Sequence, residues 1–417
     1  MGVSRVLYGS CLLWRTLRNL SRSVLPSVSA RAGIQECERK ISIFMHPYPA
    51  VDPIPLPAPI WLFKLLHIVT LALHFVAVEL LLGGLLLAVL LSLFHGHSHT
   101  AARALARRLT VVMTYVINLG VPPLLFSQVL YGRALYTSSV LIGLWWISVL
   151  ALLCATYWLL YRFSARLDAG KSAWWVGGAA WLMAGLIARL LSTNMTLMLR
   201  PEVWRDMYSA SASGAYLPVG DPTTVPRWLT MLAGGLFIAG LWLLYLSARK
   251  TFTEAEQKFL AGLGGKIAAV CGVVYLVAGL GAYGVQPEAV KVGLTGALQG
   301  YSFYHYYGLA GYLWLGLVAV AIVLGLIVGF ARIVSNLVAW TGVLLAVLIE
   351  LSLVIFRDAV RDLTLLSKGY DVWDRVVVTN WSVVGIFLVL FVAGLGVIGW
   401  LVSVVARARK EMEGVAG

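Results

Sequence analysis

The chain has 417 residues, of which 60% are hydrophobic and only 12% are charged, and its mean hydropathy is +0.86. These values exclude a soluble globular protein and indicate a polytopic membrane protein. Because basic loops gather on the cytoplasmic side of membrane proteins, the net charge of +14 fits membrane topology. We therefore expect membrane lipids, and no nucleic acid, among the partners.

Residues 1–45 form an N-terminal extension that differs from the rest of the chain. The segment is rich in Arg and Ser and has no continuous apolar core of the secretory type, so it is a little like an organelle transit peptide. Met45 opens the short lead-in MHPYPAVDPIPLPAPIW. We favour Met45 as the true start, with residues 1–45 a mis-assigned extension.

Nine apolar windows of about 20 residues follow, each long enough to cross a bilayer as a helix. They cover residues 61–94, 109–132, 139–162, 173–198, 228–248, 264–286, 303–331, 334–356 and 381–406. The sequence predicts an all-α membrane protein with two four-helix groups and a ninth helix. The first bundle covers 46–250, including an outer loop at 199–227, and the second covers 251–417. We expect a kink at Pro122-Pro123 in the second span.

Loop charge predicts the orientation. Basic residues gather in the stretches 95–108, 162–172, 249–263, 332–335 and 407–417, whereas acidic residues largely balance the basic ones in the opposite loops. The positive-inside rule then places the N-terminus, from Met45, outside and the C-terminus in the cytoplasm. A multi-pass protein of a bacterial cytoplasmic (inner) membrane fits this pattern.

Histidines in the apolar windows are candidate cofactor ligands. His67 and His74 lie two helical turns apart on one face of the first window. Neutral imidazole is a common axial ligand of b-type heme, so the pair predicts a heme site. The alternative is a pair of histidines that hydrogen-bond between helices. His305, in YSFYHYYG, is the other candidate in an outer half of a span. The HGHSHT segment at 95–100 reads as a solvated loop, so we expect no metal beyond a heme iron.

Two carboxylates lie near the middle of predicted spans. Glu79 and Glu350 are costly there unless they are neutral or paired. Relay of protons from an oxidised quinol is one interpretation, and structural pairing with Arg189 or Lys266 is the other.

A doubled Arg-Asp motif, Arg357-Asp358 and Arg361-Asp362, lies at i and i+4 near the end of the eighth span. Arginines at a membrane surface suit heme propionates, quinone carbonyls or the carboxylates of a partner, although an interfacial charged turn has the same pattern. The candidates for propionate or quinone binding are Arg357, Arg361, Gln128 and Arg133, the last two flanking the diproline segment GVPPLLFSQVLYG.

Several segments resemble a known family. ALHFVAVELLLGGLLLAVLLS is similar to the first helix of subunit I of cytochrome bd quinol oxidase, whose heme-ligating histidine falls on His74. RRLTVVMTYVINLGVPPLLFSQVLYGRALYTSS and LSTNMTLMLRP resemble its second helix and the end of its fourth. The matching positions are Asn118, Gly132, Asn194 and Pro201, and the resemblance covers roughly residues 60–250.

The departures from that family concern its oxygen site. The third helix, VLIGLWWISVLALLCATYW, has no carboxylate where the family has two glutamates. The stretches VPRWLTMLAGG and YYGLAGYLWLG lack the family's second-heme ligands at the expected places. Of the family's GRQPW motif, at most the arginine has a counterpart, in Arg357 or Arg361. The resemblance thus implies a repurposed relative that hands electrons to another subunit, and terminal oxygen reduction is not expected.

Together these features predict an integral-membrane subunit of a respiratory electron-transfer complex. Quinol would be oxidised near the outer face, and electrons would pass, through a heme b if one is bound, to an extracytoplasmic c-type cytochrome or another redox subunit. A heme-free membrane anchor or assembly subunit of such a complex is the first alternative, and a transporter is the second.

Overall fold

The computed structural model describes residue 48 and residues 55–415, so the predicted N-terminal extension 1–45 lies outside the described residues. Within this part the chain is helical, and its one β-type pairing is an isolated bridge between Leu56 and Val377. Nine of its helices are long and apolar enough to cross a membrane. They are α3 (Ile60–Leu91), α4 (His97–Leu141), α5 (Gly143–Asp168), α6 (Trp174–Leu197), α8 (Thr224–Ser247), α9 (Glu254–Gly284), α11 (Tyr304–Ala331), α12 (Asn336–Ser367) and α13 (Trp381–Val415). The all-α, multi-pass membrane architecture expected from the sequence is therefore confirmed.

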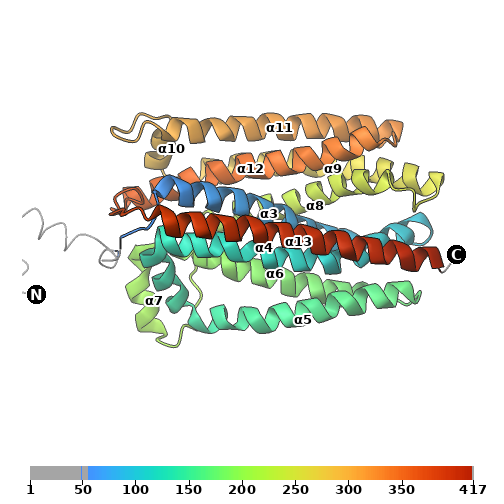
Figure 1. The fold of residues 1–417 in the computed structure, drawn as a ribbon, viewed down its shortest axis with the longest axis horizontal. Helices are drawn as coiled ribbons and strands as arrows, with labels where there is room; N and C mark the ends of the chain where they lie inside the picture. Colours follow the sequence, from blue (N-terminus) through green and yellow to red (C-terminus); the bar gives the residue numbers. More distant parts are fainter. Residues whose placement is uncertain (1–47, 49–54, 416–417) are drawn as a thin grey trace, which may run out of the picture.

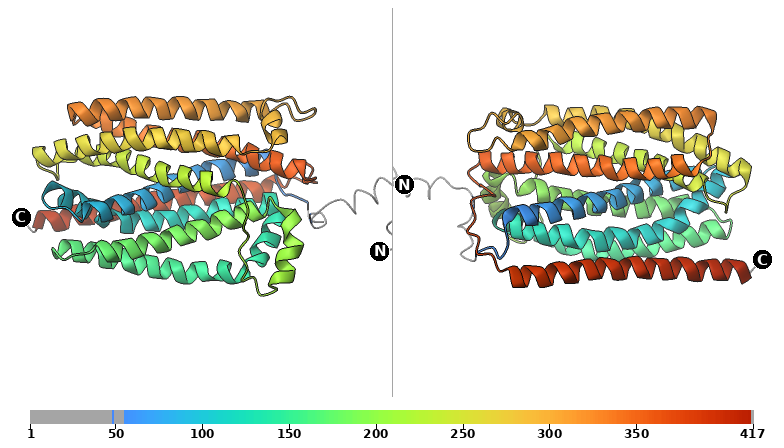
Figure 2. Two further views of the ribbon diagram at one scale, coloured as in Figure 1. Left: turned by 180° about the vertical axis from the view of Figure 1, so that it is seen from behind. Right: turned by 45° about the horizontal axis from the view of Figure 1, so that its top comes forward.

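The long helices run roughly parallel to one axis (Figure 1), with α3–α6 in one group and α8, α9, α11 and α12 in the other. Helix α3 contacts both groups, since it packs on α4 and α6 on one side and on α8 and α12 on the other. The main hydrophobic core also contains residues from both predicted bundles. Helix α13 lies along the outside of the bundle (Figure 2) and is the least buried of the nine.

Three short helices mark one end of the bundle. The 3-10 helix η1 (Pro201–Val203) and α7 (Trp204–Ala210) lie in the predicted outer loop, and α10 (Glu288–Leu294) follows α9. We call this the α7/α10 end. Helices α3, α8, α11 and α13 begin here. The Leu56 backbone N–H donates to the Val376 carbonyl (2.9 Å) and the Leu56 carbonyl accepts from the Val378 N–H (3.0 Å), which ties the entry of α3 to the entry of α13.

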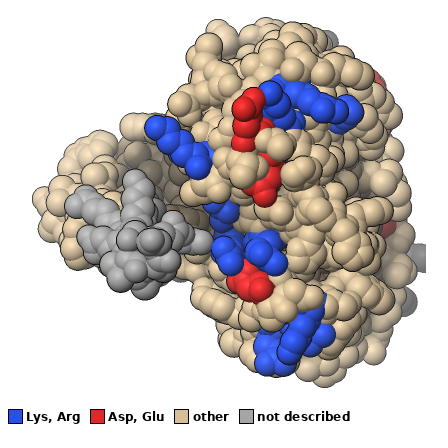
Figure 3. All heavy atoms as spheres, turned by 90° about the vertical axis from the view of Figure 1, so that its right-hand side faces the viewer, with Lys and Arg blue, Asp and Glu red and all other residues tan. Residues whose placement is uncertain are grey.

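The opposite end, which we call the basic end, carries the loops with excess Lys and Arg (Figure 3). Its ion pairs are exposed, with Arg107 2.9 Å from Asp168 and Lys258 2.5 Å from Glu254. His97 and His99 lie in the first turn of α4, not in a loop. Among the described residues, no group of three or more His, Cys, Asp and Glu side chains is placed so that it could hold a metal ion.

Several helices depart from the expected outline, since α4 begins at His97 instead of 109 and α12 ends at Ser367 instead of 356. Helix α9 begins ten residues before the predicted window at 264, because Thr253 and Glu256 form a capping box that satisfies free N–H groups of the first turn. Helix α4 keeps helical dihedral angles through Pro122 and Pro123 and leaves them only at Tyr131 (φ −121°, ψ 18°). The kink predicted at the diproline is therefore displaced toward the α7/α10 end.

Candidate functional site

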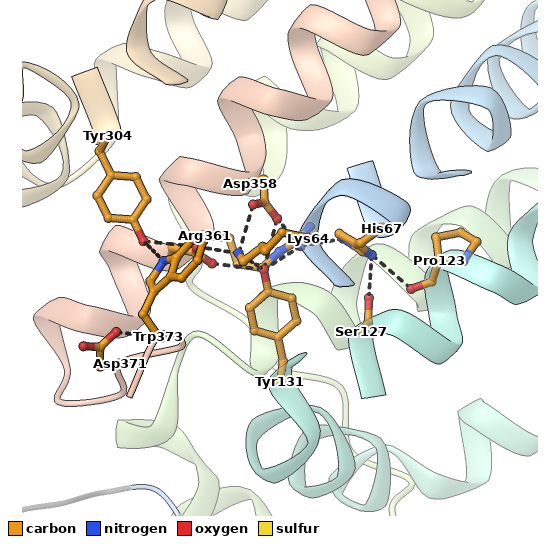
Figure 4. Close-up of polar contacts among 11 residues, drawn as sticks. Lys64, His67, Pro123, Ser127, Tyr131, Tyr304, Asp358, Arg361, Asp371 and Trp373 are labelled. Atoms are coloured by element: carbon orange, nitrogen blue, oxygen red, sulfur yellow. Dashed lines mark hydrogen bonds and ion pairs between the residues drawn. The ribbon is translucent and has the colours of Figure 1, made fainter. Parts of the chain in front are cut away.

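A cluster of buried charges joins three helices near the α7/α10 end (Figure 4). The Lys64 Nζ atom on α3 donates hydrogen bonds to the Tyr131 hydroxyl on α4 (2.8 Å) and to Asp358 Oδ2 on α12 (2.9 Å), and it pairs with Asp362. The Tyr131 hydroxyl lies 3.0 Å from both Asp358 Oδ1 and Asp362 Oδ1. We call these four residues the Lys64 cluster.

The local structure of each helix explains this convergence. Asp358 and Asp362 are one turn apart on α12, so their carboxylates point the same way. Tyr131 is the residue at which α4 is distorted, and its side chain is completely buried. Every member of the cluster therefore has a polar partner, which buried charges require in a membrane interior.

His67 and Arg361 lie at the edge of this cluster. His67 Nδ1 is 3.1 Å from the carbonyl oxygen of Pro123, and its Nε2 is 3.0 Å from Arg361 Nη1. A carbonyl only accepts and a guanidinium only donates, so the imidazole carries its proton on Nδ1 and presents a lone pair at Nε2. The geometry thus favours the hydrogen-bonding interpretation of His67 and fixes its tautomer.

A hydrogen-bonded chain leads from the cluster to the surface of the α7/α10 end. Tyr304, at the start of α11, donates to Asp362 Oδ2 (3.1 Å) and accepts from the indole N–H of Trp373 (3.0 Å). The Trp373 backbone N–H in turn donates to Asp371 (2.8 Å). Asp371 also accepts a hydrogen bond from Tyr301, which raises the pKa of the Tyr301 phenol to about 12.

The two mid-membrane carboxylates meet each other. Glu79 on α3 and Glu350 on α12 are both buried, and their carboxyl groups are in hydrogen-bonding contact. Tyr275 on α9 donates a hydrogen bond to Glu350 Oε1 (3.0 Å). Two carboxyl groups in contact in a low-dielectric interior cannot both be ionised. Among the described residues neither Arg189 nor Lys266 forms an ion pair with them, so that predicted pairing is wrong.

Arg357 connects the two polar regions along α12. It lies seven residues after Glu350 and four before Arg361, so the three side chains share one face of the helix. Its guanidinium group is 4.9 Å from the centre of the Phe75 ring and within electrostatic range of Glu79 and Glu350. A row of ionisable groups therefore runs from the membrane middle to the Lys64 cluster.

The other predicted site residues lie elsewhere. His305 is exposed at the start of α11, where it packs beside Gly296. On α4, Arg133 stacks on the Tyr370 ring at 4.4 Å, and Gln128 Oε1 accepts a hydrogen bond from Tyr136 (3.4 Å). These two residues do not share a site with Arg357 and Arg361.

The placement of the histidines does not suit a heme. A Cβ atom at Gly120 would lie 2.8 Å from Cε1 and 3.1 Å from Nδ1 of His74, so the nitrogen-bearing edge of that ring packs against the α4 backbone. At this edge, the close contact with Gly120 leaves no space for an iron atom between the His74 ring and α4. Both ring nitrogens of His67 are already bonded, and His305 is on a different part of the surface. The His74 Nδ1 atom has no hydrogen-bond partner, which is the one feature here that a ligand role would explain.

Comparison of the chain with protein-family models and with curated proteins found no match. The arrangement of the buried polar residues is therefore the basis for inferring the function. It contains three residues that sequence reasoning did not single out, namely Lys64, Tyr131 and Tyr275. A lone lysine in an apolar window, three residues before His67 on the same helix face, was the signal for the first.

Proposed function

We propose that this membrane protein is the quinol-oxidising subunit of a respiratory electron-transfer complex in a bacterial cytoplasmic membrane. The α7/α10 end would face the outside and the basic end the cytoplasm, as loop charge predicts. The observation that carries the proposal is the row of buried ionisable groups along α12, from Glu350 to Asp362. Ionisable side chains at membrane depth are rare and typically mark proton relays or substrate sites.

His67 and Arg361 are the residues proposed to contact quinol. Because Pro123 holds the His67 proton on Nδ1, Nε2 carries the lone pair that now accepts from Arg361 and that could serve as a base. A quinol hydroxyl would donate to Nε2 in place of Arg361, and the Arg361 guanidinium would then donate to the quinone oxygen as it forms. The Arg361 side chain is 13% exposed, whereas His67 is buried, so a ligand would approach the pair from the Arg361 side.

Oxidation of one quinol to quinone releases two electrons and two protons. The protons would pass through His67 and the carboxylates of the Lys64 cluster, with Tyr304 leading toward the α7/α10 surface. The Glu79–Glu350 pair, whose two carboxyl groups cannot both be ionised, would be a second proton acceptor at the inner end of the row. The electrons would pass to a redox centre of a partner, an extracytoplasmic c-type cytochrome or another redox subunit.

No step in this proposal uses a heme. The absorbance spectrum of heme b is nevertheless a direct check on His74, whose contacts do not suit ligation. A reduced-minus-oxidised spectrum of the purified full-length protein should show no absorbance that disappears in His74→Ala. Absorbance that does disappear would restore His74 as an iron ligand.

The test of the quinol site is binding of 2-heptyl-4-hydroxyquinoline N-oxide, a fluorescent quinol analogue, to the full-length protein. We expect quenching in the wild type and about tenfold weaker binding in His67→Phe and Arg361→Met, which is the loss of one charge-assisted hydrogen bond of about 1.5–3 kcal/mol. His305→Phe is the matched control, since His305 is exposed and outside the row. Equal binding by folded wild type and both variants would refute the site.

A heme-free anchor or assembly subunit is the competing function. It is favoured by one observation, that the Lys64 cluster is fully satisfied by its own members. If the row only holds helices together, His67→Phe would lower thermal stability while a co-purified redox partner kept its quinol oxidation rate. The proposal above requires that rate to fall.

A further inference from the structure

An arginine at the basic end lies against a row of aromatic rings from two helices. The guanidinium carbon of Arg249 is 3.9 Å from the centre of the Tyr245 ring on α8 and 5.9 Å from the centre of the Trp340 ring on α12. Tyr245 in turn packs edge-on against Trp340, with ring centres 5.5 Å apart, and stacks on Trp242 at 4.6 Å. These four side chains are in mutual contact, and we call them the Arg249 site.

The spacing of residues on α8 and its packing on α12 explain why these groups meet. Trp242 and Tyr245 are three residues apart and share one face of α8, and Arg249 follows about one turn later. A Cβ atom at Gly342 on α12 would lie 3.5 Å from the carbonyl oxygen of Leu241, so the two helices approach closely beside that face. The tight packing brings the ring of Trp340 against Tyr245.

No carboxylate balances the positive charge of Arg249. Among the described residues no ion pair involves it, and its Nε and Nη2 atoms are buried without a hydrogen-bond partner. The next carboxylates along the chain have other partners, since Glu254 pairs with Lys258 (2.5 Å) and Glu256 accepts from the Thr253 backbone N–H (2.9 Å). Aromatic rings attract the cation but do not supply the oxygen acceptors that its N–H groups prefer. The guanidinium group therefore lacks an anionic acceptor.

The position of the Arg249 site matches the level of lipid headgroups. Helix α8 has 24 residues, so at 1.5 Å per residue it is about 36 Å long, slightly more than the hydrocarbon core of about 30 Å. Arg249 lies two residues beyond Ser247, the last residue of α8. Trp340 lies in the second turn of α12, and tryptophan is enriched at the membrane–water interface. The site is therefore at the border between the hydrocarbon core and the headgroups.

An exposed apolar stripe on α12 leads from this site toward the middle of the membrane. Trp340, Leu344 and Leu348 are each about one helical turn apart and are 57%, 58% and 36% exposed. A lipid whose headgroup lies at Arg249 can place an acyl chain along these side chains. The stripe therefore favours a membrane lipid over a soluble anion.

We infer that the Arg249 site binds the phosphate group of an anionic phospholipid in the leaflet at the basic end. The phosphate oxygens supply the acceptors that the guanidinium group lacks, and the exposed Lys250 adds a second positive charge. The site lies at the opposite end of the bundle from His67, and it does not depend on the proposed quinol chemistry.

Lipid titration of the full-length protein in neutral detergent, followed by native mass spectrometry, tests this site. The probes are phosphatidylglycerol, phosphatidylcholine with the same acyl chains, and inorganic pyrophosphate. The test variant is Arg249→Gln. Its matched control is Arg166→Gln near the end of α5, because Arg166 also lies over a tryptophan ring, Trp175 (5.4 Å), but its Nε already donates to the Ser172 carbonyl oxygen (2.9 Å).

We expect wild type and Arg166→Gln to bind phosphatidylglycerol more tightly than phosphatidylcholine. Arg249→Gln should bind phosphatidylglycerol about tenfold more weakly than wild type, because a charge-assisted hydrogen bond is lost. If Arg249→Gln does not fold, Arg249→Lys keeps the charge but loses the planar fork of N–H donors, and it should show an intermediate loss.

Two results would overturn the inference of a lipid site. The first is equal phosphatidylglycerol binding by wild type and the folded Arg249 variants, or no preference of the wild type for phosphatidylglycerol over phosphatidylcholine. The second is displacement of phosphatidylglycerol by pyrophosphate, which would assign the site to a soluble phosphate compound instead.

Discussion

Lys64 is the residue on which the buried cluster depends. Its ammonium group faces Tyr131, Asp358 and Asp362, and all four side chains are almost fully buried. A buried ion pair adds little net stability compared with a well-packed apolar pair, but removing one partner leaves an uncompensated charge. Replacing Lys64 together with one of its aspartate partners should therefore destabilise the protein far less than replacing Lys64 alone.

Lys64→Met should lower the free energy of unfolding by about 3–5 kcal/mol, because it leaves two carboxylates in contact without their cation. The measurement is thermal unfolding of the detergent-solubilised protein. Adding Asp362→Asn to Lys64→Met should recover a large part of the loss, which a double-mutant cycle would quantify.

The control is Lys266→Met on α9, because Lys266 is exposed and lies over the Phe330 ring at 5.9 Å. Its cost should stay below about 1 kcal/mol. Equal losses for the two lysine variants would mean that Lys64 is not a buried counter-ion.

At the residue scale, the sequence indicated which types of side chain are buried in the membrane, but not which of them contact each other. The types of residue were predicted, since histidine, arginine and carboxylates at membrane depth are costly and therefore functional or paired. The partners were not, because Lys64 and Asp358 are 294 positions apart and no spacing rule links different helices. Only residues on one helix, such as His67 with Lys64 or Arg361 with Asp358, can be grouped from spacing alone.

At the scale of helices, the close crossing of α3 and α8 determines the position of Glu79. A Cβ atom at Gly83 would lie 1.8 Å from the carbonyl oxygen of Gly235, so the two backbones are in direct contact. One turn away, a Cβ at Gly234 would lie 2.8 Å from Glu79 Oε1. Small residues allow such close approach between membrane helices. The spans themselves were predictable from apolar length. The contact between Gly83 and Gly235 was not, because it depends on how the two helices pack.

Gly83→Ala should cost about 3 kcal/mol, because the added methyl group meets backbone atoms that cannot rotate away and α3 must separate from α8. Gly185→Ala on α6 is the matched control. A Cβ there meets nothing within 4 Å, and alanine is the better helix former by about 1 kcal/mol. Thermal unfolding should thus move in opposite directions for the two substitutions, and a neutral Gly83→Ala would contradict the tight crossing.

Across the whole molecule, charge is distributed unevenly between the two ends. The basic end carries Lys and Arg in the loops after α5, α8 and α11 and in the first turns of α4 (Figure 3), whereas at the α7/α10 end many charges are paired or buried, as with Lys368 and Glu202 (2.9 Å). The N-terminal residues 1–45 are basic and would alone predict the reverse orientation, but they lie outside the described residues. The orientation proposed here therefore rests on the loops that join the spans.

Cysteine labelling in intact cells tests that orientation. In a background where the four native cysteines are replaced by serine, Ser213→Cys lies in the exposed loop after α7, and Lys171→Cys in the exposed loop between α5 and α6. Since the positive-inside rule places the basic end in the cytoplasm, a membrane-impermeant maleimide should label Ser213→Cys directly and Lys171→Cys only after permeabilisation. The reverse pattern would place the Lys64 cluster and its chain through Tyr304 on the cytoplasmic side. Quinol protons would then be released inward, and an extracytoplasmic cytochrome could no longer be the electron acceptor.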